Sequence, residues 1–337
     1  MIFATPEADR AIAPAAAPPT FSVVVAAYQA ADTIGEALAS ALAQTAPPHE
    51  IVVCDDGSTD DLEAALAPFR ERIVLLRKEN GGEASAKNAA ARAATGDFVA
   101  ILDADDVYLP GRLEALGRLA AARPDLDLLT TDAYLEVDGQ VLRRVYGDDW
   151  TFEVDDQRRE IMRRNFVFGH AAVRRERLLA AGGFDERIRF TTDWECWMRL
   201  ILTGSCAGAV LEPLARYRVR QTSLSADRTR MTAGRIESLR TGLAHPSLRP
   251  EERDAARATL AGLERDLAVL RLRDAVRSGG PGTRRLALEV ASGRGVPAAT
   301  RAKALAAALA PRLAGRLLTR RAAHAWVGAG ETTVEHV

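Results

Sequence analysis

The chain has few cysteines and no long apolar run, and each shortage excludes a class of protein. Among its 337 residues the three cysteines, Cys54, Cys196 and Cys206, show neither the pairing of a disulfide framework nor the spacing of a metal site, which fits a reducing cytoplasm. Hydrophobic residues make up 47% of the chain, yet no stretch approaches the roughly 18 consecutive apolar residues that a membrane span requires. The sequence therefore predicts a cytoplasmic globular protein with one large domain or two.

The beginning of the chain lacks two further patterns. Residues 1–20 carry acids and prolines where a secretory signal peptide would carry basic and apolar segments, so we expect a disordered lead-in. The segment AAYQAADT, at residues 26–33, has no glycine-rich basic loop of the kind that would hold a triphosphate. Nucleotidyl transfer therefore stays only as an alternative function.

Charge is distributed unevenly along the chain. Residues 1–227 contain 25 Lys and Arg against 36 Asp and Glu, whereas residues 228–337 contain 20 against 10. The second segment is rich in Ala and Arg with helical spacing, and its basic character indicates an anionic surface or partner. Two interpretations stay open: helices that pack on the first segment or form a homodimer, and peripheral attachment to the inner face of an anionic membrane. The segment carries no nucleic-acid recognition motif.

Hydrophobic periodicity predicts that strands and helices alternate in the first part of the chain. Short apolar runs predict buried strands at 21–27, 51–54, 73–76 and 98–102. Helical patterns lie between them, at 32–43, 60–69 and 83–94. Three such strand–helix–strand steps predict an α/β fold with a parallel sheet. Further along, we expect a helix at 113–122, a hairpin turn at Asp138–Gly139, a strand at 167–173 and a helix at 194–202.

Three carboxylates follow the last of these strands, in the segment DFVAILDADD. They are Asp103, Asp105 and Asp106. Ligands of α/β proteins bind beyond the carboxyl ends of the strands, and crowded carboxylates there repel one another unless a cation compensates them. Hard oxygen ligands suit Mg²⁺ or Mn²⁺, which usually also bind phosphate groups. The segment therefore predicts a metal–diphosphate site.

Polar residues also follow the other predicted strands. The ring of Tyr28 is suited to stacking on a nucleobase, and Asp56 to accepting a hydrogen bond from a base N–H, with Gly57 allowing close approach of the backbone. Lys87 lies one turn into a helix that follows two glycines, a place where phosphates often bind. A turn with a helix cap at Ser58 or Thr59 and a solvated lysine are the structural alternatives.

The segments SVVVAAY, VVCDDGSTD, NGGEASAKN and LDADD, in this order and spacing, resemble the family 2 glycosyltransferases of GT-A fold. The resemblance covers about residues 21–225, and LDADD is similar to the DxD signature of that family. It implies a Rossmann-like, mainly parallel sheet flanked by helices over residues 21–227, with residues 228–337 as a helical appendage. It also implies metal-dependent, inverting transfer of a sugar from a nucleotide diphosphate, commonly UDP, to an acceptor hydroxyl in glycan biosynthesis. A lipid-linked acceptor is one candidate.

The resemblance also implies roles for individual residues. Asp105 and Asp103 would hold the divalent cation, Mn²⁺ or Mg²⁺, and Asp193 would be the catalytic base, although Thr192 replaces the Glu that usually precedes it. The positions implied at the donor are Ala27, Tyr28, Asp56, Lys87, Asp103, Ala104 and Arg220. Many relatives carry His where this chain has Arg220; an arginine cannot bind a cation but would neutralise the phosphates.

Alternatives to these roles follow from the residues themselves. Asp193 is also a good helix N-cap. Glu195 is the nearest competitor for the base, but it projects about 200° around the helix from Asp193. We expect His170 to be a core or loop histidine without a chemical role. A non-catalytic nucleotide-sugar-binding protein would need the donor residues but not Asp193.

Overall fold

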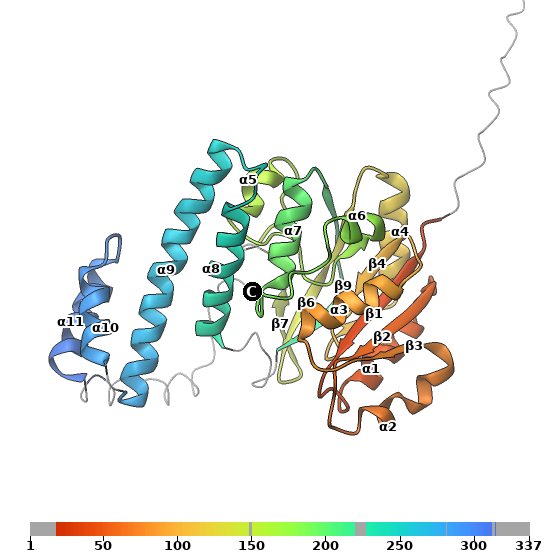
Figure 1. Ribbon diagram of the computed structural model, residues 1–337, viewed down its shortest axis with the longest axis horizontal. Coiled ribbons are helices and arrows are strands. Elements are labelled where there is room, and N and C mark those ends of the chain that lie inside the picture. Colours follow the sequence, from red (N-terminus) through yellow and green to blue (C-terminus); the bar gives the residue numbers. More distant parts are fainter. Residues whose placement is uncertain (1–17, 148–149, 220–226, 281, 312–313, 315–337) are drawn as a thin grey trace, which may run out of the picture.

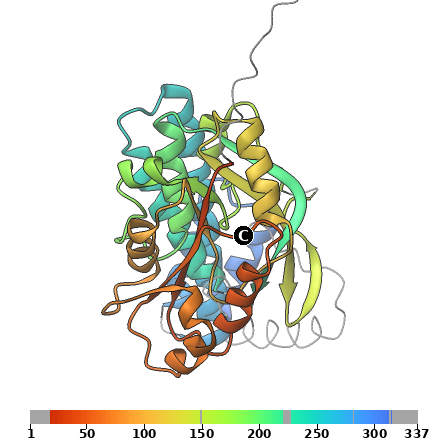
Figure 2. The same cartoon turned by 90° about the vertical axis from the view of Figure 1, so that its right-hand side faces the viewer.

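The protein is described here from a computed structural model, which covers residues 18–147, 150–219, 227–280, 282–311 and 314. Arg220 and nearly all of the expected lead-in, residues 1–20, lie outside these ranges. The described chain forms one mixed sheet with helices on both faces, and further helices extend from one side of it (Figures 1 and 2).

The sheet has nine strands among the described residues, in the order β3-β2-β1-β4-β8-β6-β9-β5, with β7 paired to β6. Its parallel part consists of β1 (Phe21–Ala27), β2 (Glu50–Asp55), β3 (Val74–Arg77) and β4 (Phe98–Ile101). The connecting helices are α1 (Ile34–Leu42), α2 (Leu62–Leu66), a 3₁₀ segment η1 (Ala67–Arg72) and α3 (Glu83–Ala93). The predicted strand–helix alternation is therefore confirmed.

Both faces of the central strands β1 and β4 are buried, because every residue of these two strands except Ser22 is apolar. Side chains of successive strand residues point to opposite faces. Val23 and Val25 of β1 accordingly join the core that includes α1 and α4 (Arg112–Ala122), whereas Val24 joins the core that includes α3 and α7 (Thr192–Leu202).

The second half of the sheet mixes antiparallel pairs with one long parallel pair, and the parallel repeat did not predict the antiparallel ones. It contains β5 (Val107–Tyr108), β6 (Leu128–Val137), β7 (Gln140–Arg144), β8 (Ala172–Arg174) and β9 (Ala207–Val219). Strand β8 is antiparallel to both β4 and β6, and β6 and β7 form the predicted hairpin. The strand expected at 167–173 is wrong in extent, because only its end pairs in β8 and the preceding residues form a loop.

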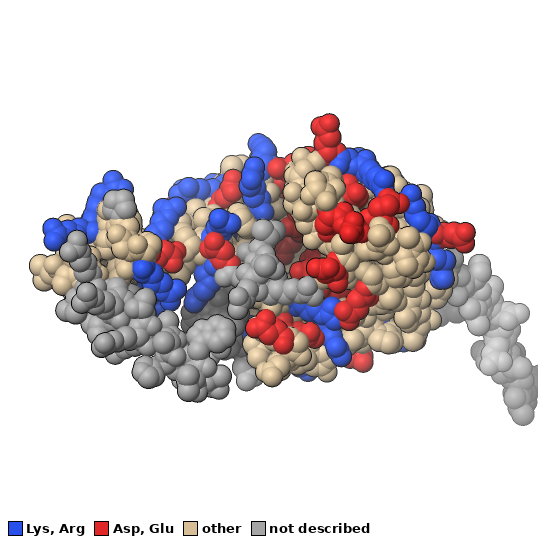
Figure 3. Space-filling model, turned by 90° about the horizontal axis from the view of Figure 1, so that it is seen from below, with Lys and Arg blue, Asp and Glu red and all other residues tan. Residues whose placement is uncertain are grey.

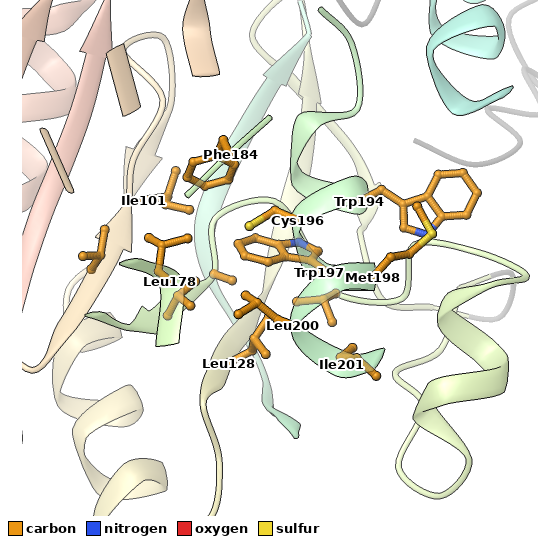
Figure 4. Close-up of a cluster of buried hydrophobic side chains, with 14 of the residues drawn as sticks. Ile101, Leu128, Leu178, Phe184, Trp194, Cys196, Trp197, Met198, Leu200 and Ile201 are labelled. Atoms are coloured by element: carbon orange, nitrogen blue, oxygen red, sulfur yellow. The ribbon is translucent and has the colours of Figure 1, made fainter. Parts of the chain in front are cut away.

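The amphipathic helix α7 anchors this half to the core. Trp197 is fully buried, and its ring lies 6.0 Å from that of Phe184. The indole N–H of Trp194 donates to the carbonyl of Ile161, 2.7 Å away, in the short helix α5 (Gln157–Ile161). Figure 4 shows Trp194, Trp197 and Phe184 in one cluster with Ile101 of β4 and Leu178 of α6 (Arg175–Ala180).

The C-terminal region packs in two separate ways. Its helices are α8 (Arg228–Leu243), α9 (Pro250–Ser278), α10 (Thr283–Ser292) and α11 (Ala298–Leu309). Leu239 and Ala256, from α8 and the first half of α9, belong to the same core as Trp197, whereas Val276 and Val290 belong to a distinct cluster formed with α10 and α11. None of the helices in the described ranges has the length and apolarity needed to cross a membrane.

Candidate active site

The three carboxylates of LDADD lie just beyond β4, at the carboxyl end of the parallel strands, where the sequence placed them. Asp103 Oδ1 is 2.8 Å from Nζ of the buried Lys87, which also lies 2.5 Å from Glu83 Oε1. Ala27 and Ala104 are buried nearby in the core beneath this edge. Burial would raise the pKa of Asp103, but the positive charges of Lys87 and His170 hold it well below its usual range.

His170 joins this cluster, which sequence reasoning did not foresee. Its Nε2 atom lies 2.6 Å from Asp106 Oδ2 and 3.4 Å from Asp103 Oδ2, and the residue is 1% exposed. Burial would lower the pKa of His170, but the neighbouring carboxylates outweigh it and raise the pKa to about 9. The one available signal was a histidine inside an apolar segment, FVFGHAAV, where an unpaired polar ring would be costly.

The cluster fits a divalent cation. Ligand atoms of Asp103, Asp106 and His170 lie within 4.8 Å of one another. Of the two metal ligands that the sequence predicts, Asp105 and Asp103, this group contains only Asp103, and Asp106 and His170 complete it. Asp105 is half-buried close by: burial and the Asp106 and Asp103 carboxylates raise its pKa to about 7. Such an excess of buried carboxylate oxygens suits Mg²⁺ or Mn²⁺.

Asp193 lies in the first turn of α7 and is not its N-cap, because the helix begins at Thr192 after a cap at Thr191. Asn165 Nδ2 donates to Asp193 Oδ2 over 2.9 Å. A Cβ atom at Gly169 would lie 3.2 Å from the same oxygen, so the loop backbone packs closely on this carboxylate. Burial raises the pKa of Asp193.

One loop, residues 165–170, links the two parts of the site. Asn165 and Gly169 contact Asp193, and the next residue, His170, contacts Asp106 and Asp103. The charge of Lys87 acts on both ends, because it lowers the pKa of Asp103 and opposes the rise in that of Asp193. The loop therefore brings together residues that the sequence separates by about 90 positions.

Glu195, the competing carboxylate, has a structural partner instead. Both its oxygens accept hydrogen bonds from the Arg199 guanidinium, at 2.6 and 2.8 Å, and the residue is 1% exposed.

Figure 3 shows acidic side chains gathered near the centre of the lower face, with basic side chains over the C-terminal helices.

The two residues expected at the nucleobase, Tyr28 and Asp56, differ in their exposure to solvent. Tyr28, at the end of β1, is 53% exposed. Asp56 is buried, and its oxygens accept hydrogen bonds from Lys78 Nζ at 2.7 Å, from Gly81 N at 3.0 Å and from Gly82 N at 2.7 Å. Asp56 thus ties the loop after β2 to the loop before α3.

The end of β9 approaches the carboxylate cluster as well. The backbone N–H of Arg218 donates to Asp106 Oδ1 over 2.7 Å, and its guanidinium pairs with Glu36. The ring of Tyr217 lies edge-on to that of His170, with centroids 6.1 Å apart. Arg220, implied at the diphosphate, follows this strand outside the described residues.

Comparison with known proteins assigns the family. The family model described as Glycosyl transferase family 2 matches residues 22–181. The putative teichuronic acid biosynthesis glycosyltransferase TuaG of Bacillus subtilis is 30% identical over 214 residues, which cover 62% of this chain and 83% of TuaG. This chain belongs to glycosyltransferase family 2. An uncharacterized glycosyltransferase of Rickettsia prowazekii is 29% identical over 194 residues, 56% of this chain and 60% of that relative, so the chain spans under two thirds of it.

Solved structures share the GT-A fold of this family 2 member. S. aureus TarS 1–349 in complex with UDP-GlcNAc matches with a TM-score of 0.54 and 19% identity, over 91% of each chain. The mannosyltransferase PcManGT from Pyrobaculum calidifontis, in complex with GDP-Man and Mn²⁺, matches with a TM-score of 0.57 and 22% identity, over 92% of this chain and 81% of PcManGT. At these identities the likeness concerns the fold.

Proposed function

We propose that this glycosyltransferase moves a sugar from a nucleotide diphosphate donor, with UDP-sugars the first to test, to an acceptor hydroxyl, with inversion and with Mn²⁺ or Mg²⁺. One observation carries the proposal: loop 165–170 contacts a half-buried carboxylate, Asp193, at one end and the Asp103–Asp106 cluster at the other. A proton acceptor and a cation site on one loop are the two parts that glycosyl transfer needs.

In this proposal, the donor side is formed by the carboxylate cluster and the strand ends around it. Asp103 and Asp105 would hold the cation, beside Asp106 and His170. The bound ion would stabilise negative charge on the departing diphosphate. Tyr28 and Asp56 would bind the base, Lys87 would keep Asp103 ionised, and Arg220 would neutralise phosphate. A donor bound through Asp56 has to replace some of the hydrogen bonds that this residue makes to the loop before α3.

The proposed role of Asp193 is to remove the proton from the acceptor hydroxyl. The acceptor oxygen forms a bond to C1 of the sugar as the bond from C1 to the diphosphate oxygen breaks, on the opposite face. One displacement inverts the anomeric centre, so an α-configured donor gives a β-linked product. Glu195 does not compete for this role, because Arg199 binds both of its oxygens.

We propose a polysaccharide or another glycoconjugate as the acceptor class. The name of TuaG refers to teichuronic acid biosynthesis, which supports this class. The basic region 228–337 would then help to present the acceptor, either through its packed helices or through contact with an anionic membrane that carries a lipid-linked acceptor. Flotation with anionic vesicles at low salt separates these two possibilities.

A donor panel tests the proposal directly. We expect one class of nucleotide sugar to raise the melting temperature of the protein in the presence of Mn²⁺ and to do so much less after chelation with EDTA. NMR of the product should then show an inverted anomeric centre. A panel without any stabilising donor, or a product with retained configuration, would contradict the proposal.

A further inference from the structure

Helix α8 presents an arginine at the centre of its buried face. The buried residues of this helix are Thr232, Gly234, Ile236, Ser238, Leu239 and Gly242. Successive helix residues are turned by about 100°, so Arg235 lies in the middle of this set, within about 60° of Ser238, Leu239 and Gly242. A charged residue usually lies at the edge of such a face, where its head group reaches water.

Small residues fix this face of α8 against the segment just before Asp193. A Cβ atom at Gly234 would overlap Phe190. Ser238 Oγ lies 2.9 Å from Thr191 Oγ1 and donates to the Thr191 carbonyl over 3.2 Å. Thr191 has a φ of 56°, in the left-handed region that a β-branched residue rarely adopts, so the packing of α8 supports the backbone that positions Asp193.

The face of α8 that carries Arg235 packs on Phe190 and Thr191, the segment just before the proposed base. Burial lowers the pKa of Arg235, and the Asp193 carboxylate and Tyr217 of β9 act against that effect. Arg228, two turns earlier on the same side of α8, lowers the pKa of Arg235 further through repulsion between like charges. Arg235, with Arg228 on the same side of the helix, thus lies on the face of α8 that packs on the residues leading into Asp193, whereas the carboxylate cluster and His170 lie on the side formed by β4 and loop 165–170.

We propose that Arg235, assisted by Arg228, binds an oxyanion, phosphate or carboxylate, carried by the acceptor whose hydroxyl Asp193 deprotonates. A planar guanidinium binds either oxyanion through paired hydrogen bonds, and a bound anion relieves the repulsion between the two arginines. The fixed position of α8 holds the anion site at a constant distance from the base. This inference deepens the proposed function and rests on the role of Asp193 as the base.

Calorimetric titration with simple anions tests the inference on the full chain. The protein is first saturated with Mn²⁺ and the nucleoside diphosphate of the donor found in the panel, so that the donor site is filled. Inorganic phosphate and glucuronate are then titrated separately into the wild type and into Arg235→Gln, Arg235→Lys and Arg228→Gln. The matched control is Arg240→Gln, because Arg240 is an exposed residue of α8 that pairs with Glu264 over 2.7 Å.

We expect at least one anion to bind the wild type and Arg240→Gln equally. Arg235→Gln should weaken that binding on the order of ten- to a hundredfold, Arg235→Lys less, because it keeps the charge but not the planar fork, and Arg228→Gln less again. The preferred anion distinguishes a phosphate-bearing from a uronate-type acceptor. Arg228→Gln and Arg235→Lys keep the test decisive if Arg235→Gln is poorly folded. No binding to the wild type, or equal binding in all variants, overturns the inference.

Donor hydrolysis separates this inference from the proposed function. Water replaces the acceptor in that reaction, so the wild type and Arg240→Gln should hydrolyse the donor slowly in the presence of Mn²⁺. Arg235-dependent anion binding without any donor turnover would overturn the proposed function and leave the anion site in place. Donor turnover with anion binding that does not depend on Arg235 would overturn the anion site alone.

Discussion

At the scale of single residues, the groups around Asp193 act on its pKa in opposite directions. Burial raises the pKa of this carboxyl, whereas the backbone N–H of Trp194, the charge of Lys87 and the hydrogen bond from Asn165 favour its ionised form, and Glu83 opposes ionisation. The balance leaves the pKa above its ordinary value of 3.8. A carboxylate with a raised pKa is a stronger proton acceptor, which suits a general base.

Replacing Asp193 by Asn should remove the proton acceptor but keep the size of the side chain. We expect kcat to fall about 10²- to 10⁴-fold, because general base catalysis contributes an effect of that order. The donor-induced rise in melting temperature should persist, since Asp193 is not part of the donor cluster. Asp125→Asn, at an exposed residue paired with Arg123, is the control and should have normal kcat. Loss of donor binding in Asp193→Asn would show that Asp193 acts on the donor instead.

The carboxyl group of Asp193 should also determine how kcat/KM falls at acidic pH. Asp193 accepts a proton only when ionised, so kcat/KM should fall as the pH drops through its raised pKa, above the ordinary value of 3.8. Asn165→Ala removes a hydrogen bond to the charged form and should move this limb to higher pH. A limb that stays in place in Asn165→Ala would contradict the assignment.

His170 should matter for the cation. His170→Gln removes the imidazole next to Asp106 and Asp103, and we expect the affinity for Mn²⁺, followed by electron paramagnetic resonance, to fall about 10- to 100-fold, as for other residues that bind or orient metal ligands. His49→Gln, at an exposed histidine that contacts Thr95, is the matched control. Equal Mn²⁺ affinity in the two variants would limit His170 to a structural role.

At the scale of secondary-structure elements, the close packing of α8 supports the backbone just before Asp193, the proposed base. Gly234, Ser238 and Gly242 are four residues apart, so they form one stripe along the helix. Gly234 packs on Phe190, and Gly242 packs on Met198 and Met162. The stripe lets α8 approach α7 and the residues before it more closely than larger side chains would allow.

Gly234→Ala tests this docking. The added methyl group would lie 3.2 Å from the carbonyl oxygen of Phe190 and closer still to the Cβ atom of Phe190. The backbone of α8 or of the Phe190 segment therefore has to move. We expect about 1–3 kcal/mol of destabilisation in urea unfolding, as is usual for overpacking. Gly262→Ala in α9 is the control: its Cβ would meet only Arg265 Nη2, at 3.7 Å, so it should stabilise by about 0.5–1 kcal/mol. Equal effects of both substitutions would refute close docking.

At the scale of the whole molecule, the C-terminal region is divided by its packing. Helix α8 and the first half of α9 complete a core that includes α7, and Arg158 of α5 binds Glu252 of α9 through both oxygens, at 2.6 and 2.9 Å. The end of α9 packs with α10 and α11 in a cluster of its own. Figure 1 shows this second group at the far end of the molecule from β1–β4.

Two truncations follow from this division. A chain ending at Ser278 loses α10 and α11 but keeps the core around α7, so its donor-induced melting shift should match that of the full chain. A chain ending at Asp227 exposes the surface that Leu239, Leu248 and Ala256 cover, and we expect it to be aggregated or much less stable. Scanning fluorimetry of both chains checks this, and a stable chain ending at Asp227 would contradict it.

The sequence by itself determined the parallel half of the sheet and the position of LDADD at its edge, because both depend on short-range patterns: apolar strands, helical periodicity and acids directly after a strand. Tertiary structure alone decided that loop 165–170 enters the site, that His170 meets Asp106, and that the face of α8 with Arg235 packs just before Asp193. These contacts join residues more than 20 positions apart in the sequence. Local periodicity carries no information about them, because they arise only when β8, α7 and α8 pack together.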